Sequence, residues 1–383
     1  MRIGKIIKGF LFLSLILLPC TCVLLVDAQG QGLEQTNVFV SGTEGYHTFR
    51  IPAVIATQKG TLLAFCEGRK DSRSDTGNID LVLRRSTDNG ETWGPLQIVA
   101  DDGPNTIGNP CPVVDRDTGT IWLPLTRNLG EDSEGEISAG KSKGTREVWI
   151  TKSTDDGKTW AKPIEITCDT KAPNWTWYAT GPGNGIQLQS GRLLIPCDHR
   201  IAVADRYRSH VIYSDDHGKT WRLGGDIREH VNECAAVELA DGSIMMNMRS
   251  YKREKCRAEA ISRDGGITWT EARSNPTLIE PVCQASFIRY TLAEKHGKNR
   301  ILFSNPASSK RDTMTVRLSY DEAKTWPVSK VLHPGPSAYS SLVVLPDMSI
   351  GCLYERGDEH PYETIAFARF TLGWLTNGRD KLN

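Results

Sequence analysis

An eight-residue phrase recurs along this chain and limits its possible folds more than any other feature. The pattern is Ser-x-Asp-x-Gly-x-Thr-Trp, and the tryptophan that ends each copy stands at positions 93, 160, 221, 269 and 326. The fifth copy has Ala323 in place of the glycine. Self-similarity at steps of 48 to 67 residues indicates a repeat architecture, in which one structural unit is built several times.

The chemistry of the phrase predicts a tight turn between β-strands. The aspartate carboxylate can accept hydrogen bonds from backbone N–H groups, and the glycine can adopt a positive φ. The Thr-Trp end favours a strand, and the indole can fill the core beside the turn. Short strand-like segments surround each copy, so each repeat is expected to form one small antiparallel sheet.

Five marked repeats and one unmarked set of strands predict an all-β fold, a six-bladed β-propeller with four-stranded antiparallel blades. The unmarked set comprises residues 341–345, 350–354 and 364–370. We expect residues 37–40 to pair with this last set and close the ring. A two-sheet sandwich is the alternative, but it does not explain why the phrase recurs once per four strands.

The first residues resemble a secretory signal peptide rather than part of the fold. Basic residues precede an apolar run at 10–26, and Val26-Asp27-Ala28 offers a cleavage site. The chain is therefore expected to be secreted or periplasmic. If the run is not cleaved, it would instead anchor the protein in a membrane, because about 17 apolar residues lie near the lower limit for a span. A lipoprotein at Cys20 fits less well, since Pro19 precedes it.

These patterns divide the chain into four expected parts. They are a signal peptide at 1–28, a short leader at 29–36, the propeller at 37–377 and a tail at 378–383. The segment from Gly130 to Gly144 is rich in glycine, serine and charge. We interpret it as a mobile loop near the mouth of the pocket that affects substrate access.

Charge and cysteine usage narrow the possible partners. Lys plus Arg and Asp plus Glu both total 46, so nothing indicates nucleic acid or an obligate membrane partner, and we expect a monomer. Eight cysteines follow the leader segment without any Cys-x-x-Cys pair, so no zinc is expected. An oxidising compartment would permit disulfides, whose pairing stays open. Cys66 and Cys197 lie in apolar runs typical of buried small hydrophobes. Asn174-Trp175-Thr176 is a glycosylation sequon.

Three arginines in or beside apolar strands carry the first functional hint. Arg50, Arg249 and Arg317 come from different parts of the chain. A buried, unpaired charge is costly, and a salt bridge between blades would explain any one of them. Together they suggest convergence on an anion, most simply a carboxylate gripped bidentately.

Phe49-Arg50-Ile51-Pro52, followed by the five turns, closely resembles the sialidase (exo-α-neuraminidase) family, from about residue 38 to residue 370. The resemblance implies a six-bladed propeller with its site at the central axis. It also implies an exo-α-sialidase that needs no cofactor and no metal. The implied partners are sialylated glycans, with terminal α-linked sialic acids on glycoproteins, glycolipids such as gangliosides, and oligosaccharides.

The resemblance also implies a role for each matching residue. The expected roles are the sialic acid carboxylate clamp for Arg50, Arg249 and Arg317, nucleophile for Tyr339, its general base for Glu233, acid/base for Asp75, sugar contact for Arg69, and orientation of Arg50 for Glu355. Asp71 is an alternative to Asp75, because both follow Arg69 in the same polar loop.

The chemistry of a sialoside fits a tyrosine nucleophile. Its anomeric carbon carries a carboxylate, which would repel an attacking Asp or Glu, whereas a neutral phenol avoids this repulsion. A phenol pKa near 10 requires a base, the role given to Glu233. Two displacements predict net retention of configuration.

Two further functions stay open. One is a relative that transglycosylates, reacts intramolecularly or accepts a related nonulosonic acid. The other is a propeller that binds glycans without turnover, although binding alone does not need a tyrosine–glutamate pair.

Overall fold

The computed structural model describes Met1 and residues 32–202, 206–228 and 230–382. The predicted signal peptide falls outside these residues apart from Met1. A compact unit spans Gly32–Asn383 and is all-β. Among the described residues, no helix is both long and apolar enough to cross a membrane.

The strands form successive antiparallel runs in chain order. The first run contains β2 (Thr48–Ala56), β3 (Leu62–Arg69), β4 (Ile79–Ser86) and β5 (Gln97–Ala100). The second contains β6 (Thr106–Gly108), β7 (Val113–Val114), β8 (Ile121–Asn128), β9 (Glu147–Ser153) and β10 (Ile164–Glu165). The third contains β11 (Tyr178–Thr180), β12 (Ile186–Gln187), β13 (Leu193–Ile201), β14 (Arg206–Ser214) and β15 (Arg222–Ile227).

The later runs repeat this plan. The fourth contains β16 (Val231–Glu238), β17 (Ile244–Ser250), β18 (Cys256–Ser262) and β19 (Arg273–Ile279). The fifth contains β20 (Ser286–Thr291), β21 (Arg300–Pro306), β22 (Asp312–Ser319) and the first part of β23 (Val328–Val344). The last contains the rest of β23, β24 (Ile350–Arg356), β25 (Thr364–Phe370) and β1 (Leu33–Val40).

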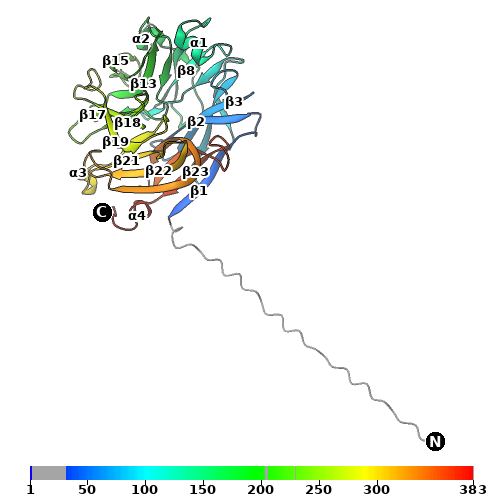
Figure 1. Ribbon diagram of the computed structural model, residues 1–383, viewed down its shortest axis with the longest axis vertical. Coiled ribbons are helices and arrows are strands. Elements are labelled where there is room, and N and C mark those ends of the chain that lie inside the picture. Colours follow the sequence, from blue (N-terminus) through cyan, green and yellow to red (C-terminus); the bar gives the residue numbers. More distant parts are fainter. Residues whose placement is uncertain (2–31, 203–205, 229, 383) are drawn as a thin grey trace. The chain divides into compact units, whose positions relative to one another are not determined.

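The pairing of β1 with β25 confirms that the N-terminal strand joins the last run. The elements follow one another around the body in chain order, from blue β2 and β3 through green β13 to orange β22 and β23 beside β1 (Figure 1). This arrangement fits a β-propeller. Hydrogen bonds join the described strands into four sheets, so the separation into six blades stays a prediction.

The core is divided into clusters between neighbouring runs. One cluster packs Leu83 of the first run against Leu123 of the second, and comparable clusters join each later pair. Another packs Val54 of the first run against Leu353 and Phe367 of the last. Apolar burial therefore links the runs in a closed circle.

The repeated phrase forms the predicted turn. In the first copy Asp88 accepts a hydrogen bond from the backbone N–H of Thr92 at 3.0 Å, and Gly90 has φ of 87°. Each copy begins at the residue that ends the penultimate strand of its run. The indole packs toward a neighbouring run in several copies, as where Trp93 meets Phe367 with ring centroids 5.3 Å apart.

The ends of the fold differ from the predicted boundaries. β1 begins at Leu33 rather than at residue 37, because residues 33–36 also pair with β25. Asp380, in the predicted tail, accepts two hydrogen bonds from buried Arg300 at 2.8 and 2.9 Å. Residues 33–36 and Asp380 therefore belong to the packed body.

Four short α-helices complete the part of the fold that the structure describes. They are α1 (Glu134–Ala139), α2 (Thr167–Thr170), α3 (Ala293–His296) and α4 (Leu372–Leu375). Helix α1 lies in the segment interpreted above as a mobile loop. Ser133 and Glu136 cap its first turn reciprocally, which stabilises the orphan N–H groups of a helix start. The segment is thus structured around a capped helix.

The cysteines that the structure describes are free thiols, and all except Cys168 are buried. Cys66 and Cys197 are fully buried, which confirms that they act as small hydrophobes.

The glycine of the repeat turn has a steric role that a substitution can test. An added Cβ at Gly218 would lie 2.2 Å from the Trp122 indole of the preceding run. We expect Gly218→Ala to lower the free energy of unfolding by about 2 kcal/mol beyond the cost of the positive φ. Gly265→Ala is the matched control, since its φ of 73° is similar but its Cβ would meet only the flexible end of Arg192. Urea denaturation measures both, and equal losses would contradict the prediction.

Candidate active site

A cavity of about 390 Å³ collects most of the predicted site residues. Those that line it are Arg50, Arg69, Asp75, Glu233, Arg249 and Tyr339. Helix α1 contributes Glu134 to the wall, so the segment from Gly130 to Gly144 does lie beside the pocket. The cavity lies at the strand edge away from the repeat turns. Arg50 and Glu233 stand near the starts of first strands, and Arg69 and Arg249 stand at or near the ends of second strands.

Irregular pairing turns three key segments toward this cavity. The register shifts between Arg50 and Ala53 in β2, between Val231 and Cys234 in β16, and between Ser337 and Ser340 in β23. Such bulges re-aim side chains and are common beside active sites.

The bulge in β2 explains part of the Phe-Arg-Ile-Pro motif. Ile51 has φ of 62°, a left-handed conformation that is unusual for a β-branched residue. Pro52, which cannot donate to a neighbouring strand, follows it inside the irregular stretch.

Glu355 lies behind the cavity, fully buried near the end of β24. Its carboxylate accepts hydrogen bonds from Arg50 Nε at 3.1 Å and Arg50 Nη2 at 3.2 Å. It also accepts from the backbone N–H groups of Ile51 at 2.9 Å and Tyr339 at 3.0 Å. One carboxylate thus fixes the Arg50 guanidinium and the two bulged strands that carry Arg50 and Tyr339.

Tyr339, Glu233 and Arg249 form a buried cluster. The Tyr339 hydroxyl donates to Glu233 Oε1, and Arg249 Nη1 donates to the Tyr339 oxygen at 3.2 Å. The same Arg249 nitrogen lies 2.7 Å from Glu233 Oε2. Burial and the Glu233 carboxylate raise the pKa of Tyr339 well above 10, although Arg249 and two other arginines oppose this rise. The phenol is therefore neutral at rest, and Glu233 is placed to accept its proton.

Asp75 and Arg69 occupy another side of the cavity. Asp75 Oδ1 lies 2.7 Å from Arg69 Nη2 and 3.6 Å from Arg50 Nη1, while its side chain stays 58% exposed. Burial opposes ionisation, but Arg69 and Arg50 hold the pKa of Asp75 below its usual value. Asp75 is thus an accessible carboxylate that faces the same guanidinium groups a substrate anion would meet.

The prediction that Arg317 joins this cluster is wrong, and Arg311 lines the cavity instead. Arg311 Nη1 donates to the Tyr362 hydroxyl at 2.6 Å, and its guanidinium carbon lies 5.6 Å from the centre of the Tyr339 ring. Arg317 follows six residues later, near the end of β22, which corresponds to about 20 Å of extended strand. It therefore lies at the edge of the repeat turns.

The strand order held a signal for Arg311. The penultimate strand of a run begins at the cavity edge and ends at the first serine of its repeat turn. Arg311 directly precedes β22, the penultimate strand of its run, whereas Arg317 stands two residues before Ser319 of the repeat turn.

Sequence reasoning also missed several other residues that line the cavity. They are Glu67, Arg146, Asp198, Tyr251 and Tyr362. The guanidinium carbon of Arg50 lies 3.8 Å from the centre of the Tyr362 ring, so this tyrosine covers one face of the arginine.

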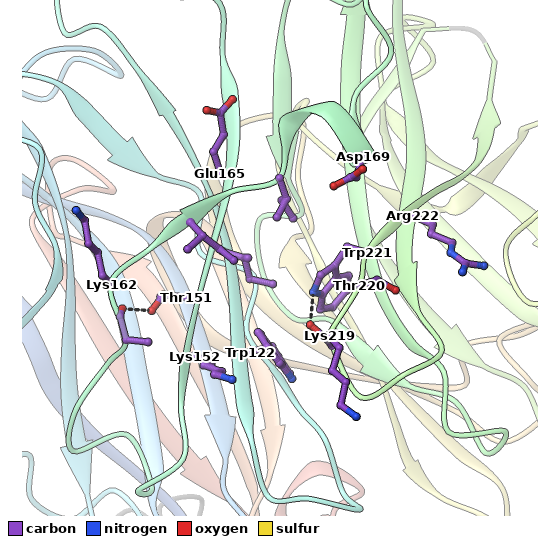
Figure 2. A pocket seen from close by; sticks show the side chains of 15 residues that line it. Trp122, Thr151, Lys152, Lys162, Glu165, Asp169, Lys219, Thr220, Trp221 and Arg222 are labelled. Carbon is purple, nitrogen blue, oxygen red and sulfur yellow. Dashed lines mark hydrogen bonds between the residues drawn. The ribbon is translucent and has the colours of Figure 1, made fainter.

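A second, wider cavity of about 750 Å³ lies between the second and third runs (Figure 2). Trp122, Trp221, Lys162 and Glu165 are among its lining residues, and none of the predicted site residues is. Trp122 and Trp221 are more than nine-tenths buried and pack edge-to-face, so they mainly hold the two runs together.

Comparison with known proteins decides the family. A family model described as "BNR repeat-like domain" matches residues 60–353. The chain is 33% identical to the exo-alpha-sialidase of Arthroderma benhamiae, over 87% of this chain and 86% of the relative.

The chain belongs to the sialidase family.

Other sialidases show how far this likeness extends. The Micromonospora viridifaciens sialidase is 37% identical over 89% of this chain, which spans only 54% of that relative's length. Human sialidase-3 is 31% identical over 85% of this chain and 89% of its own length. Among solved structures, the Hadza microbial sialidase Hz136 superposes with a TM-score of 0.82 at 34% identity, covering 89% of this chain and 69% of that one.

The central position of Glu355 in this sialidase site can be tested by removing its charge. We expect Glu355→Gln to lower the free energy of unfolding by about 3 kcal/mol, because buried Arg50 would lose its paired charge. Glu34→Gln is the matched control, since Glu34 is 69% exposed and lies 3.6 Å from Arg369. The control is expected to change stability by less than about 0.5 kcal/mol. Similar urea midpoints for both variants and the wild type would contradict this role.

Proposed function

We propose that this chain is an exo-α-sialidase that releases terminal α-linked sialic acids from glycoproteins, from glycolipids such as gangliosides, and from oligosaccharides. The observation that carries the proposal is the buried hydrogen bond from the Tyr339 hydroxyl to Glu233, with Arg249 donating to the same phenol oxygen. A site that only binds glycans has no need of a phenol coupled to a base.

Binding begins with the sialic acid carboxylate. Arg50, Arg249 and Arg311 supply guanidinium groups that can hold it through charge-assisted hydrogen bonds. The anomeric carbon then lies above Tyr339, whose ring packs near both Arg50 and Arg311. Arg311 takes the role first given to Arg317.

In the first displacement the Tyr339 oxygen bonds to the anomeric carbon as its proton moves to Glu233. The bond to the leaving oxygen breaks, and a proton from Asp75 neutralises that oxygen. Before substrate binds, Asp75 is ionised beside Arg69 and Arg50, so it must first take up this proton from the solvent. A substrate carboxylate at Arg50 adds a like charge nearby, which raises the tendency of Asp75 to bind this proton.

In the second displacement Asp75 removes a proton from water, whose oxygen attacks the same carbon. The bond to Tyr339 breaks, and Glu233 returns the proton to the phenol. Two inversions at one carbon give net retention. Retention is expected whether water or a sugar hydroxyl attacks in the second displacement. Only the products therefore distinguish a hydrolase from a transglycosylating relative.

The propeller supports this site by carrying it on several strand runs. We propose six blades, closed by the pairing of β1 with β25. We also propose that residues 1–28 direct the chain out of the cytoplasm, as a secreted or periplasmic monomer, with membrane anchoring by this segment as the alternative.

Substitution of the proposed nucleophile tests the mechanism. With a fluorogenic aryl sialoside, we expect Tyr339→Phe to lower kcat by about 10²-fold or more, because the ring remains but the attacking oxygen is lost. Tyr354→Phe is the matched control. It removes a buried hydroxyl that donates to Gln35 at 2.7 Å, outside the cavity, and is expected to retain full activity.

Product analysis completes this experiment. The first product that NMR detects should be the α-anomer of free sialic acid. Full activity of Tyr339→Phe would contradict the role of Tyr339 as nucleophile. An initial β-anomer would contradict the two-displacement mechanism. If the wild type released no sialic acid, the proposed enzyme activity would be wrong.

The choice between the two arginines gives an independent prediction. Arg311→Ala should lower kcat/KM by about 10- to 100-fold, because a charge-assisted contact to the carboxylate is lost. Arg317→Ala should change kcat/KM by less than about twofold, since Arg317 lies outside the cavity. Steady-state kinetics on the same sialoside measures both variants. A larger loss for Arg317→Ala than for Arg311→Ala would contradict the prediction and support Arg317 as the carboxylate-binding residue.

A further inference from the structure

Asp198 is a buried cavity residue that the proposed mechanism does not use. It lies in β13, lines the cavity and has no solvent-exposed surface. Neither of its carboxyl oxygens has a hydrogen-bond partner among the described residues. A buried polar group without a partner costs stability, so its retention requires an explanation.

The local geometry turns this carboxyl group toward the cavity. Strand neighbours point to opposite faces, and the next residue, His199, stacks on Trp175 with ring centroids 3.4 Å apart. Asp198 pairs across the sheet with Ala179, which also lines the cavity. Asp198 and Ala179 are therefore neighbours in the same wall of the cavity.

The surrounding charges favour a neutral carboxylic acid. Burial raises the pKa of Asp198 well above its usual value, and Glu233 and Glu134 raise it further, against the opposing effect of Arg249 and Arg146. A protonated carboxyl group can donate one hydrogen bond and accept others. A hydroxyl group of a sugar has the same double capacity and is its natural complement.

The position of Asp198 indicates which part of a sialic acid it faces. The three arginines that can hold the carboxylate come from the first, fourth and fifth runs, whereas Asp198 comes from the third. In a sialic acid the carboxylate lies on the anomeric carbon, and the polyhydroxylated side chain extends from the ring carbon on the other side of the ring oxygen. The Asp198 wall also carries Glu134 and Tyr251, two further groups suited to hydroxyls.

We propose that Asp198 binds the polyhydroxylated side chain of the sugar and makes the enzyme selective for substrates that carry it intact. This inference rests on the proposed function and adds a specificity-determining residue to it. The unpartnered carboxyl group is then a binding group that is satisfied by substrate.

A pair of substrates isolates this contact. One is a fluorogenic aryl ketoside of N-acetylneuraminic acid, and the other is the same compound with its side chain shortened to seven carbons by periodate cleavage and borohydride reduction. Wild type should lose about tenfold in kcat/KM on the shortened substrate, because Asp198 is left unpaired. Asp198→Ala should lose about tenfold on the intact substrate but less than about threefold on the shortened one.

Asp198→Asn is the conservative control. Its amide still donates and accepts hydrogen bonds, so most of the preference for the intact side chain should remain. Asp198→Ala should melt no more than a few degrees below the wild type, since it removes an unpartnered buried polar group. An equal loss on both substrates, or a large loss of thermal stability, would show that Asp198 is structural and would overturn the inference.

The assay separates this inference from the function on which it rests. If wild type hydrolyses neither compound, the proposed function fails. The same two compounds then serve as ligands in calorimetric titrations of wild type and Asp198→Ala. Selectivity for the intact side chain that disappears in Asp198→Ala supports the contact, and its absence in the wild type overturns it.

Discussion

The buried carboxylate of Glu355 is the interaction on which the geometry of this site depends. It accepts two hydrogen bonds from Arg50 and one from each backbone N–H of Ile51 and Tyr339. These donors belong to β2 and β23, at opposite ends of the chain, and both strands are bulged where they meet Glu355. A bulge frees backbone N–H groups from the strand ladder, and a buried free N–H is costly. Glu355 satisfies those groups and neutralises Arg50 at once, so the strained approach of Arg50 and Tyr339 to the cavity depends on a single side chain.

Strand direction separates the scaffold from the chemistry. The repeat turns follow the ends of the penultimate strands, and their aspartates are satisfied within each turn, as Asp88 is by Thr92. The cavity residues lie at the other edge, where the unpartnered Asp198 is tolerated. Closed apolar clusters between successive runs hold the two edges in a fixed relation. Stability is therefore concentrated away from the groups that cost stability, as expected where a site must keep binding groups free.

Sequence was sufficient for those features that local chemistry or a contiguous motif determines. The turn phrase predicted the β-rich repeat plan, and Phe-Arg-Ile-Pro located Arg50 within a strand. The error at Arg317 arose because an arginine in an apolar strand has the same appearance at either end of that strand. Only the direction of β22 relative to its turn distinguishes Arg317 from Arg311. The sequence could not predict a role for Asp198, for another reason. No motif marks its strand, and whether its carboxyl group has a partner depends on how β13 packs against segments distant in the chain.

The same cluster of charges constrains how the site can change on binding. Arg50 is held from behind by Glu355 at 3.1 and 3.2 Å, whereas its Nη1 lies 3.6 Å from the exposed carboxylate of Asp75. An incoming carboxylate can therefore replace Asp75 without disturbing Arg50. Because Asp75 stays close to Arg69 at 2.7 Å, it loses one of two cationic neighbours rather than both. In the proposed mechanism, this arrangement would couple substrate binding to the protonation of Asp75 through a single guanidinium group, without movement of the strands that carry Tyr339 and Glu233.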